Sequence, residues 1–130
     1  MAADATPGFR LVVSPESNLT SLRRAEVARI FLRKQSRWKD GRDVLPVDQS
    51  ARSPVRAAFS RDVLAVEGLD KISAVEGFWR QQIFSGRGTP PAIKASDAEV
   101  LQFVASTPGA IGYVSDSASV AGVKTIAVQD

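Results

Sequence analysis

The sequence predicts an α/β domain in which helices flank a mostly parallel sheet with an antiparallel edge strand. Short apolar runs rich in β-branched residues recur along the chain, and segments with apolar residues at every third or fourth position separate them. Turn residues divide the two kinds of segment. The resulting order is β, α, β, α, α, α, β, β, and strands that alternate with helices favour a parallel sheet.

The first half of the chain predicts two strands and two helices. Residues 9–14 form an apolar strand, and residues 22–32 form a helix with one broad apolar face. A polar loop follows, from which Trp38 is expected to cover the edge of the core. A second strand spans 44–47, and a second helix runs from Ser53 to about residue 64.

The second half of the chain predicts two further helices and two further strands. Apolar residues at helical spacing indicate a helix over 69–84, and two glycines and two prolines make 85–91 a loop. The run that begins Ser96-Asp97-Ala98-Glu99 is a capping box, which predicts a helix start at Ser96. β-branched runs at 111–114 and 123–128 indicate the last two strands.

The length of 130 residues indicates one domain. Residues 1–8 are small and polar and end in Pro-Gly, so we expect a flexible N-terminal arm followed by a domain over 9–130. This arm has neither a basic region nor an apolar region of the kind found in signal peptides. No apolar run is long enough to cross a membrane, so no membrane span is expected.

The chain contains no cysteine and no histidine. Disulfides, thiolate nucleophiles, Ser-His-Asp catalysis and zinc sites with nitrogen or sulfur ligands are therefore excluded. An enzyme would need a carboxylate pair such as Asp48 with Asp62 or Glu67, and their spacing does not bring two of them to one site. We expect no enzyme activity, no cofactor and no metal.

Positive charge is concentrated in one part of the chain, within a net charge of +3. Eight Lys and Arg residues lie between Arg23 and Arg42, opposed there only by Glu26 and Asp40. A basic stretch of this kind is one mark of nucleic-acid binding. Here the charges fall mostly on the polar side of a predicted helix, without interleaved aromatic residues, so a solvated surface is favoured and no nucleic-acid partner is expected.

The segment 44–59 carries the strongest sign of a binding site. It reads as strand, polar loop and helix, with Ser53 at the N-cap and Pro54 at the first helical position. Such a loop directs backbone N–H groups, the hydroxyls of Ser50 and Ser53 and a guanidinium toward one place, which is the arrangement of an anion site. An ordinary helix start after a polar loop is the alternative interpretation.

Several motifs in this order resemble phosphate-type periplasmic substrate-binding proteins. The first two are similar to the family patterns IF-x-G-K and W-x-D-G, and the last matches the signature PGAIGYV. The matching segments are 30–34, 38–41, 78–79, 83–86, 90–91 and 108–114. The resemblance runs from about Leu11 to Val128 and is closest to short members that consist of a single lobe.

The resemblance implies one lobe of a type 2 periplasmic binding protein. In that family an oxyanion is held between two lobes by loops and helix N-termini, and the binding loop of the second lobe corresponds here to 48–59. The sequence departs from the family pattern there, because no Gly-Thr follows a serine and Asp48 stands where an arginine is expected. The candidate oxyanion-binding residues are Ser14, Ser50, Arg52, Ser53 and Arg56.

The resemblance leaves two hypotheses for function. The first is a substrate-binding-like protein of the bacterial periplasm or cell envelope that binds phosphate or a similar oxyanion weakly and serves a transporter or sensor protein, its signal peptide lying outside the given sequence. The second is an interaction or structural protein of the envelope that keeps the lobe fold without a ligand, for which a lipid anchor is one means of attachment. The missing Gly-Thr and arginine of the binding loop motivate the second hypothesis.

Overall fold

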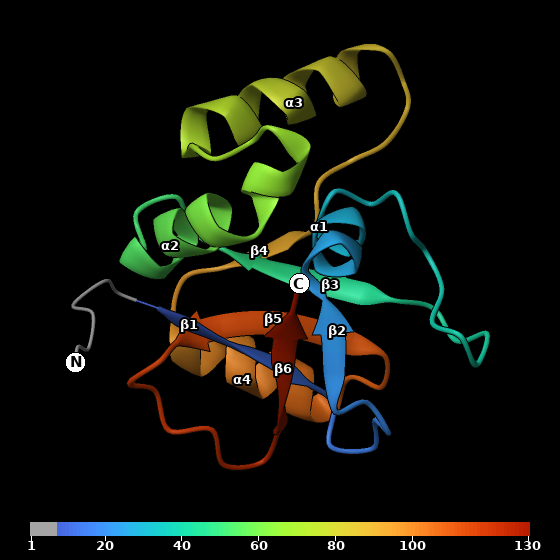
Figure 1. The fold of residues 1–130 in the computed structure, drawn as a ribbon, viewed down its shortest axis with the longest axis vertical. Coiled ribbons are helices and arrows are strands. Elements are labelled where there is room, and N and C mark those ends of the chain that lie inside the picture. Colours follow the sequence, from blue (N-terminus) through green and yellow to red (C-terminus); the bar gives the residue numbers. More distant parts are fainter. Residues whose placement is uncertain (1–7) are drawn as a thin grey trace.

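A computed structural model describes residues 8–130 and gives a six-stranded sheet with helices on both faces (Figure 1). The expected N-terminal arm, 1–8, lies outside the described residues except for Gly8. The elements in chain order are β1 (Phe9–Val13), β2 (Ser21–Arg23), α1 (Arg24–Phe31), β3 (Leu45–Gln49), α2 (Pro54–Asp62), the 3-10 helix η1 (Leu64–Glu67), α3 (Ile72–Phe84), β4 (Ala92–Lys94), α4 (Asp97–Ser106), β5 (Ala110–Ser115) and β6 (Lys124–Gln129).

The sheet has the order β2-β6-β1-β5-β3-β4 and is mostly parallel. The pairs β2·β6, β3·β5 and β3·β4 are parallel, whereas β1 runs antiparallel to both of its neighbours, β5 and β6. The α/β class and the mostly parallel sheet are as predicted. The antiparallel strand is β1, which lies between β5 and β6 inside the sheet.

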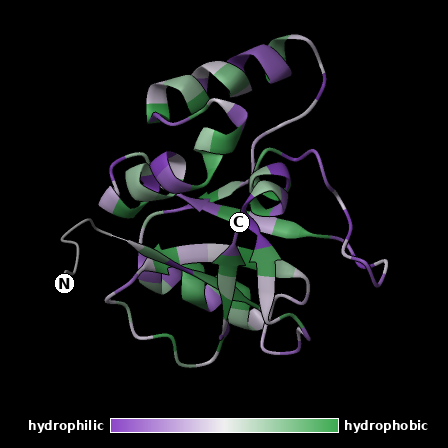
Figure 2. Ribbon diagram, viewed as in Figure 1, coloured by the Kyte–Doolittle hydropathy of each residue, from purple (hydrophilic) through white to green (hydrophobic). Residues whose placement is uncertain are grey.

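Helices cover both faces of the sheet (Figure 1). α1 and α2 pack on one face and α4 packs on the other, while α3 lies outside α2 and extends away from the sheet. The strands at the centre are apolar along most of their length, and the outer surfaces of the helices carry most of the polar residues (Figure 2). Two hydrophobic clusters therefore form, one between the sheet and α1 and α2, the other between the sheet and α4.

β5 joins the two clusters because its side chains alternate between the faces of the sheet. Ile111 and Tyr113 belong to the cluster under α1 and α2, whereas Val114 belongs to the cluster under α4. Gly112 leaves room for α4, because a Cβ atom there would lie 2.8 Å from methyl carbons of both Val47 and Val100. The close approach of α4 to the sheet therefore depends on a residue without a side chain at this position.

The structure contains two short edge strands that the sequence pattern did not reveal. β2 and β4 have three residues each, too few for a periodic signal. β2 occupies the first residues of the predicted helix 22–32, so α1 begins only at Arg24. β3 extends through Asp48 and Gln49, which the sequence placed in a loop.

Candidate functional site

The polar loop at residues 50–53 lies at the carboxyl end of β3 and leads directly into α2. Ser50 N donates to Lys94 O at 3.0 Å, which continues the pairing with β4 by one residue. Ser50 Oγ accepts from Arg52 N at 3.2 Å, and Ser53 N donates to Ser50 O at 2.9 Å. These bonds fold the loop into a tight turn and fix where α2 begins.

Two side chains at this turn have no partner among residues 8–130. Ser53 occupies the N-cap position with extended backbone, and Pro54 follows at the first helical position, as predicted. The Ser53 hydroxyl nevertheless makes no capping hydrogen bond, and the exposed Arg52 side chain makes no hydrogen bond or ion pair. Both therefore stand free beside the positive end of the α2 dipole.

Arg56 follows the turn in the first turn of α2, and its side chain is buried in the interior of the domain. Its side chain is 9% exposed, Nη1 donates to Gln49 O at 3.1 Å, and Nε lies 3.7 Å from Asp48 Oδ1. The guanidinium is thus used inside the fold, where it compensates a buried carboxylate. The sequence placed Arg56 with Ser50 and Ser53 as an anion-binding residue, but in the structure its charged end is engaged with Asp48 and Gln49.

Asp48 is the centre of a buried polar cluster beneath α2. Oδ1 accepts hydrogen bonds from the hydroxyl of Tyr113 and from Gln49 N, the latter at 2.9 Å. Burial raises the pKa of Asp48 above its ordinary value, although the charge of Arg56 and the bond from Tyr113 oppose the shift. Burial and the Asp48 carboxylate together raise the pKa of Tyr113 well above its usual value, so the phenol remains a hydrogen-bond donor.

A second polar network links the ends of three elements next to the turn. Gln49 Nε2 donates to Asp97 Oδ1 at 2.7 Å and to Tyr113 O at 3.1 Å. Ser115 donates to the same carboxylate through both its backbone N–H, at 3.1 Å, and its hydroxyl. Desolvation raises the pKa of Asp97, but the bonds from Ser115 and Gln49 outweigh it and hold that pKa below its ordinary value.

This network was missed in the sequence because its members are far apart along the chain. Gln49 and Tyr113 are separated by 64 residues, and Gln49 and Asp97 by 48. The one available signal was Asp97 itself, at the first position of a well-capped helix. Its carboxylate turns toward the ends of β3 and β5 and holds them in place beside the candidate loop.

Ser14 lies at the other end of the sheet from the candidate loop. It follows β1, which runs antiparallel to the rest, so it sits at the amino ends of β3 and β5. Ser14 N donates to Ala110 O at 3.3 Å, and its buried hydroxyl accepts from Glu16 N at 3.4 Å. Of the five candidates, the structure therefore brings together Ser50, Arg52 and Ser53 but neither Ser14 nor the charged end of Arg56.

The three carboxylates considered for an enzyme occupy separate places. Each of Asp48, Asp62 and Glu67 has a cationic partner of its own, and no two of them share one. The partners are Arg56, Arg24 and Lys34 in that order, at 3.7, 2.8 and 2.8 Å. Within residues 8–130, no three His, Cys, Asp or Glu side chains gather as a metal site would require.

No protein-family model and no curated protein matches the chain. Several solved structures do match the fold of the chain. An ABC-type phosphate transport receptor from Vibrio cholerae matches at 17% identity and a TM-score of 0.67, over 94% of this chain and 46% of the receptor. PstS from Borrelia burgdorferi matches at 16% identity and a TM-score of 0.68, over 94% of this chain and 47% of PstS.

These likenesses establish a fold. The chain has the fold of one lobe of a type 2 periplasmic binding protein, as the sequence resemblance implied, and the solved structures that share it are substrate-binding proteins of phosphate transport. The chain spans less than half the length of those proteins. No helix among the described residues has the length and apolar character needed to cross a lipid bilayer.

Proposed function

We propose that residues 9–130 act as a single substrate-binding-like lobe that binds phosphate or a similar oxyanion weakly at the start of α2. The free Arg52 guanidinium and the free Ser53 hydroxyl, on consecutive residues before the first turn of α2, carry this proposal. The dipole of α2 adds to the attraction of both groups for a negative charge. The choice of phosphate as the ligand class is supported by the fold shared with solved structures that include an ABC-type phosphate transport receptor.

Weak binding follows from the exposure of the site. Each charge-assisted hydrogen bond contributes about 1.5–3 kcal/mol before the cost of dehydrating the anion. Pro54 removes one N–H donor from the helix start, and Arg56 is engaged with Asp48. A few contacts on one exposed surface correspond to dissociation constants of roughly millimolar order.

The site suits a role in transport or sensing at the periplasm or cell envelope. A weakly held anion on one lobe would be bound tightly only when a second surface closes over it, because dehydration strengthens each charged contact. A transporter or sensor protein could supply that surface. This assignment rests on the phosphate-transport proteins that share the fold.

Titration of the isotope-labelled chain with phosphate at constant ionic strength tests the proposal. We expect saturable shifts of the backbone amides in 50–56, with Arg52→Gln and Ser53→Ala each weakening the binding severalfold. Arg87→Gln is the matched control, because Arg87 is an exposed arginine of another loop and the substitution changes the net charge equally. Flat spectra up to tens of millimolar phosphate, about tenfold above the expected dissociation constant, would contradict oxyanion binding.

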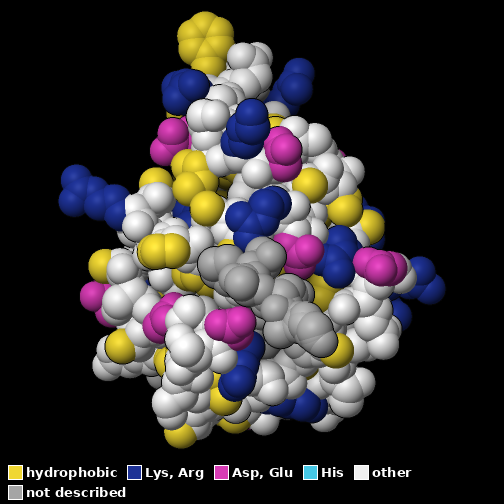
Figure 3. Space-filling view, turned by 60° about the vertical axis from the view of Figure 1, so that its left-hand side comes forward, with side chains coloured by type: hydrophobic (Ala, Val, Ile, Leu, Met, Phe, Trp, Pro, Cys, Tyr) yellow, Lys and Arg dark blue, Asp and Glu magenta, His cyan; other side chains and the backbone are white. Residues whose placement is uncertain are grey.

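A ligand-free interaction protein is the second candidate, and one observation favours it. α3 ends in exposed apolar side chains, since Phe84 is 89% and Ile83 54% exposed. Figure 3 shows a hydrophobic side chain projecting from this end of the molecule between Lys or Arg side chains. Flat phosphate titrations, together with a partner protein whose binding Phe84→Ser abolishes, would establish this function in place of the first.

A further inference from the structure

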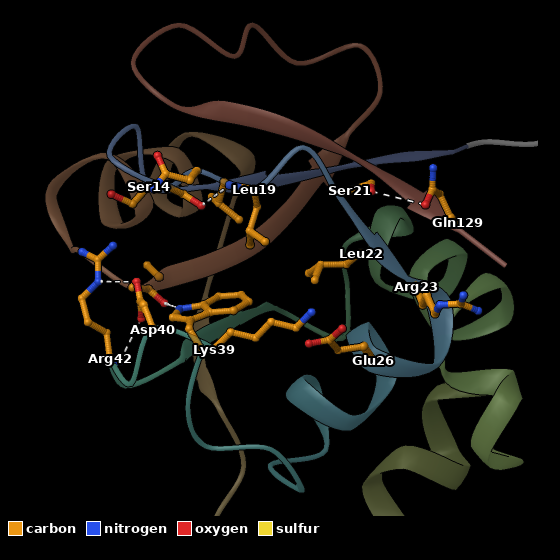
Figure 4. A pocket seen from close by; sticks show the side chains of 16 residues that line it. Ser14, Leu19, Ser21, Leu22, Arg23, Glu26, Lys39, Asp40, Arg42 and Gln129 are labelled. Carbon is orange, nitrogen blue, oxygen red and sulfur yellow. Dashed lines mark hydrogen bonds and ion pairs between the residues drawn. The ribbon is translucent and has the colours of Figure 1, made fainter.

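A pocket of about 430 Å³ reaches from the amino end of β5, at Ala110, along β2 to the carboxyl end of β6, at Gln129 (Figure 4). The turn after β1, the strand β2 and the loop 38–42 form its walls. Its volume falls within the range of about 300–1,000 Å³ that is usual for small-molecule sites. The oxyanion proposal makes no use of this pocket, and the pocket lies outside the candidate loop.

One wall of the pocket is held rigidly by the loop 38–42. Trp38 Nε1 donates to Gly109 O at 3.0 Å, and Trp38 N donates to Arg42 O at 2.8 Å. Asp40 accepts from the backbone N–H of Arg42 at 3.0 Å and from its Nε at 3.1 Å. The indole ring is therefore fixed at its nitrogen and packs partly against the hydrophobic core, and the ring also lines the pocket.

The opposite wall is also ordered by hydrogen bonds. Ser17 Oγ accepts from Leu19 N at 3.1 Å, and Ser17 O accepts from Lys124 Nζ at 3.0 Å. Leu19 and Leu22 project into the pocket from this side (Figure 4). A flat apolar group would thus meet leucine side chains on one side and Trp38 on the other, with little ordering left to occur on binding.

Only some of the charged side chains at the pocket make ion pairs or hydrogen bonds with other residues. Arg42 pairs with Asp40, and Glu26 accepts a hydrogen bond from Gln35 at 3.1 Å. Lys39 points across the pocket toward Glu26 (Figure 4), but it has no ion pair or hydrogen bond within residues 8–130. An ammonium group that makes no ion pair at the side of an apolar pocket favours a ligand that carries a negative charge.

We propose that this pocket binds a small aryl monocarboxylate, with its ring between Leu19 and Trp38 and its carboxylate on Lys39. The single charge follows from the lining, where Arg23, Lys39 and Arg42 face Glu26 and Asp40, three cationic groups against two carboxylates, which leaves one positive charge in excess. Inorganic phosphate, which is a mixture of monoanion and dianion near neutral pH and has no apolar part, does not fit these walls. The pocket therefore differs from the α2 site in the class of ligand that it takes.

Phenylacetate is the probe that tests this proposal on the full chain. The indole N–H signal of Trp38 should shift saturably, with a dissociation constant of roughly millimolar order for a ligand of this size. The signal of Trp79, the only other tryptophan, is an internal control because that side chain is buried in the core. Trp79→Phe assigns the two signals without changing the pocket.

Variants and related compounds separate the contributions of charge and ring. Lys39→Gln should weaken phenylacetate binding about fivefold, as expected for an exposed charge pair. Lys71→Gln should leave the affinity unchanged, because Lys71 is exposed and lies outside the pocket. Benzyl alcohol, which lacks the charge, and acetate, which lacks the ring, should each bind more weakly than phenylacetate.

Three results would overturn the proposal. The first is a Trp38 signal that does not saturate by about 20 mM phenylacetate, some tenfold above the expected dissociation constant. The second is an affinity for phenylacetate that Lys39→Gln leaves unchanged. The third is a shift of the Trp38 signal with inorganic phosphate that equals the shift with phenylacetate. Because phosphate binding at α2 is read from the amides of 50–56, failure at one site is distinguishable from failure at the other.

Discussion

Asp48 is a buried carboxylate whose side-chain partners, Tyr113 and Arg56, come from β5 and α2, while Gln49 of β3 donates its backbone N–H, so the energetic cost of burying Asp48 depends on single side chains. Tyr113 donates its hydroxyl to Asp48, while its ring stacks on Phe59 with centroids 4.0 Å apart. Tyr113→Phe keeps the stacking and removes the donor. We expect a loss of about 1–3 kcal/mol in the free energy of unfolding, measured by urea denaturation, because a buried acceptor loses a partner. A loss below about 0.5 kcal/mol would mean that Arg56 and Gln49 suffice to hold the carboxylate.

These residues also mark how far the sequence could predict the site. The loop with Ser50, Arg52 and Ser53 followed from local signals, since a polar run before Ser-Pro is visible in the sequence. The inward turn of Arg56 was not predictable, because it depends on the burial of Asp48 in a strand. That burial is in turn compensated by Tyr113, 65 residues away.

At the scale of the elements, the two serine-initiated helices differ in their capping. Ser96 Oγ accepts from Glu99 N at 3.3 Å at the start of α4, whereas the Ser53 hydroxyl makes no such bond at the start of α2. Ser96→Ala should therefore lower the free energy of unfolding by about 1 kcal/mol, and Ser53→Ala by less than about 0.5 kcal/mol. Thermal or urea denaturation of both variants measures the difference. Equal losses would show that Ser53 caps α2 in solution and is not held free for an anion.

The sequence predicted helices and strands correctly where they carry a local pattern, and it missed the short strands that exist only because they pair with a neighbouring strand. The helix start at Ser96 was predicted because the capping box is local. β2 and β4 became strands only through parallel pairing with β6 and β3. A three-residue segment has no period of its own, so tertiary contacts decide its conformation.

For the whole molecule, Asp97 and Asp48 give opposite pH dependences of stability. The pKa of Asp97 is lowered in the folded state, so its contribution is present above the ordinary value of 3.8 and is lost as the pH falls below it. The pKa of Asp48 is raised, so the folded state binds its proton more tightly, and stability decreases as the pH rises from 3.8 through the folded pKa.

Urea denaturation from about pH 3 to pH 7 checks this difference. Asp97→Asn should reduce the loss of stability below pH 3.8, and Asp48→Asn should reduce the decrease in stability as the pH rises above 3.8. Both substitutions also change hydrogen bonds, so the slope against pH is the quantity to compare. Unchanged slopes in both variants would mean that other carboxylates govern the acid transition.

The reversed direction of β1 has a mechanical consequence. β1 and β6 are antiparallel neighbours, with Leu11 opposite Ile126 and Val13 opposite Lys124. The chain enters β1 at Phe9 and leaves β6 at Gln129, and these two ends lie at the same end of the β1·β6 ladder. A pulling force applied at these two points would load the hydrogen bonds of that ladder one after another, as in opening a zipper, and would not load them all together in shear. Under tension the domain should therefore yield first along this seam, which separates β2 and β6 from the other four strands.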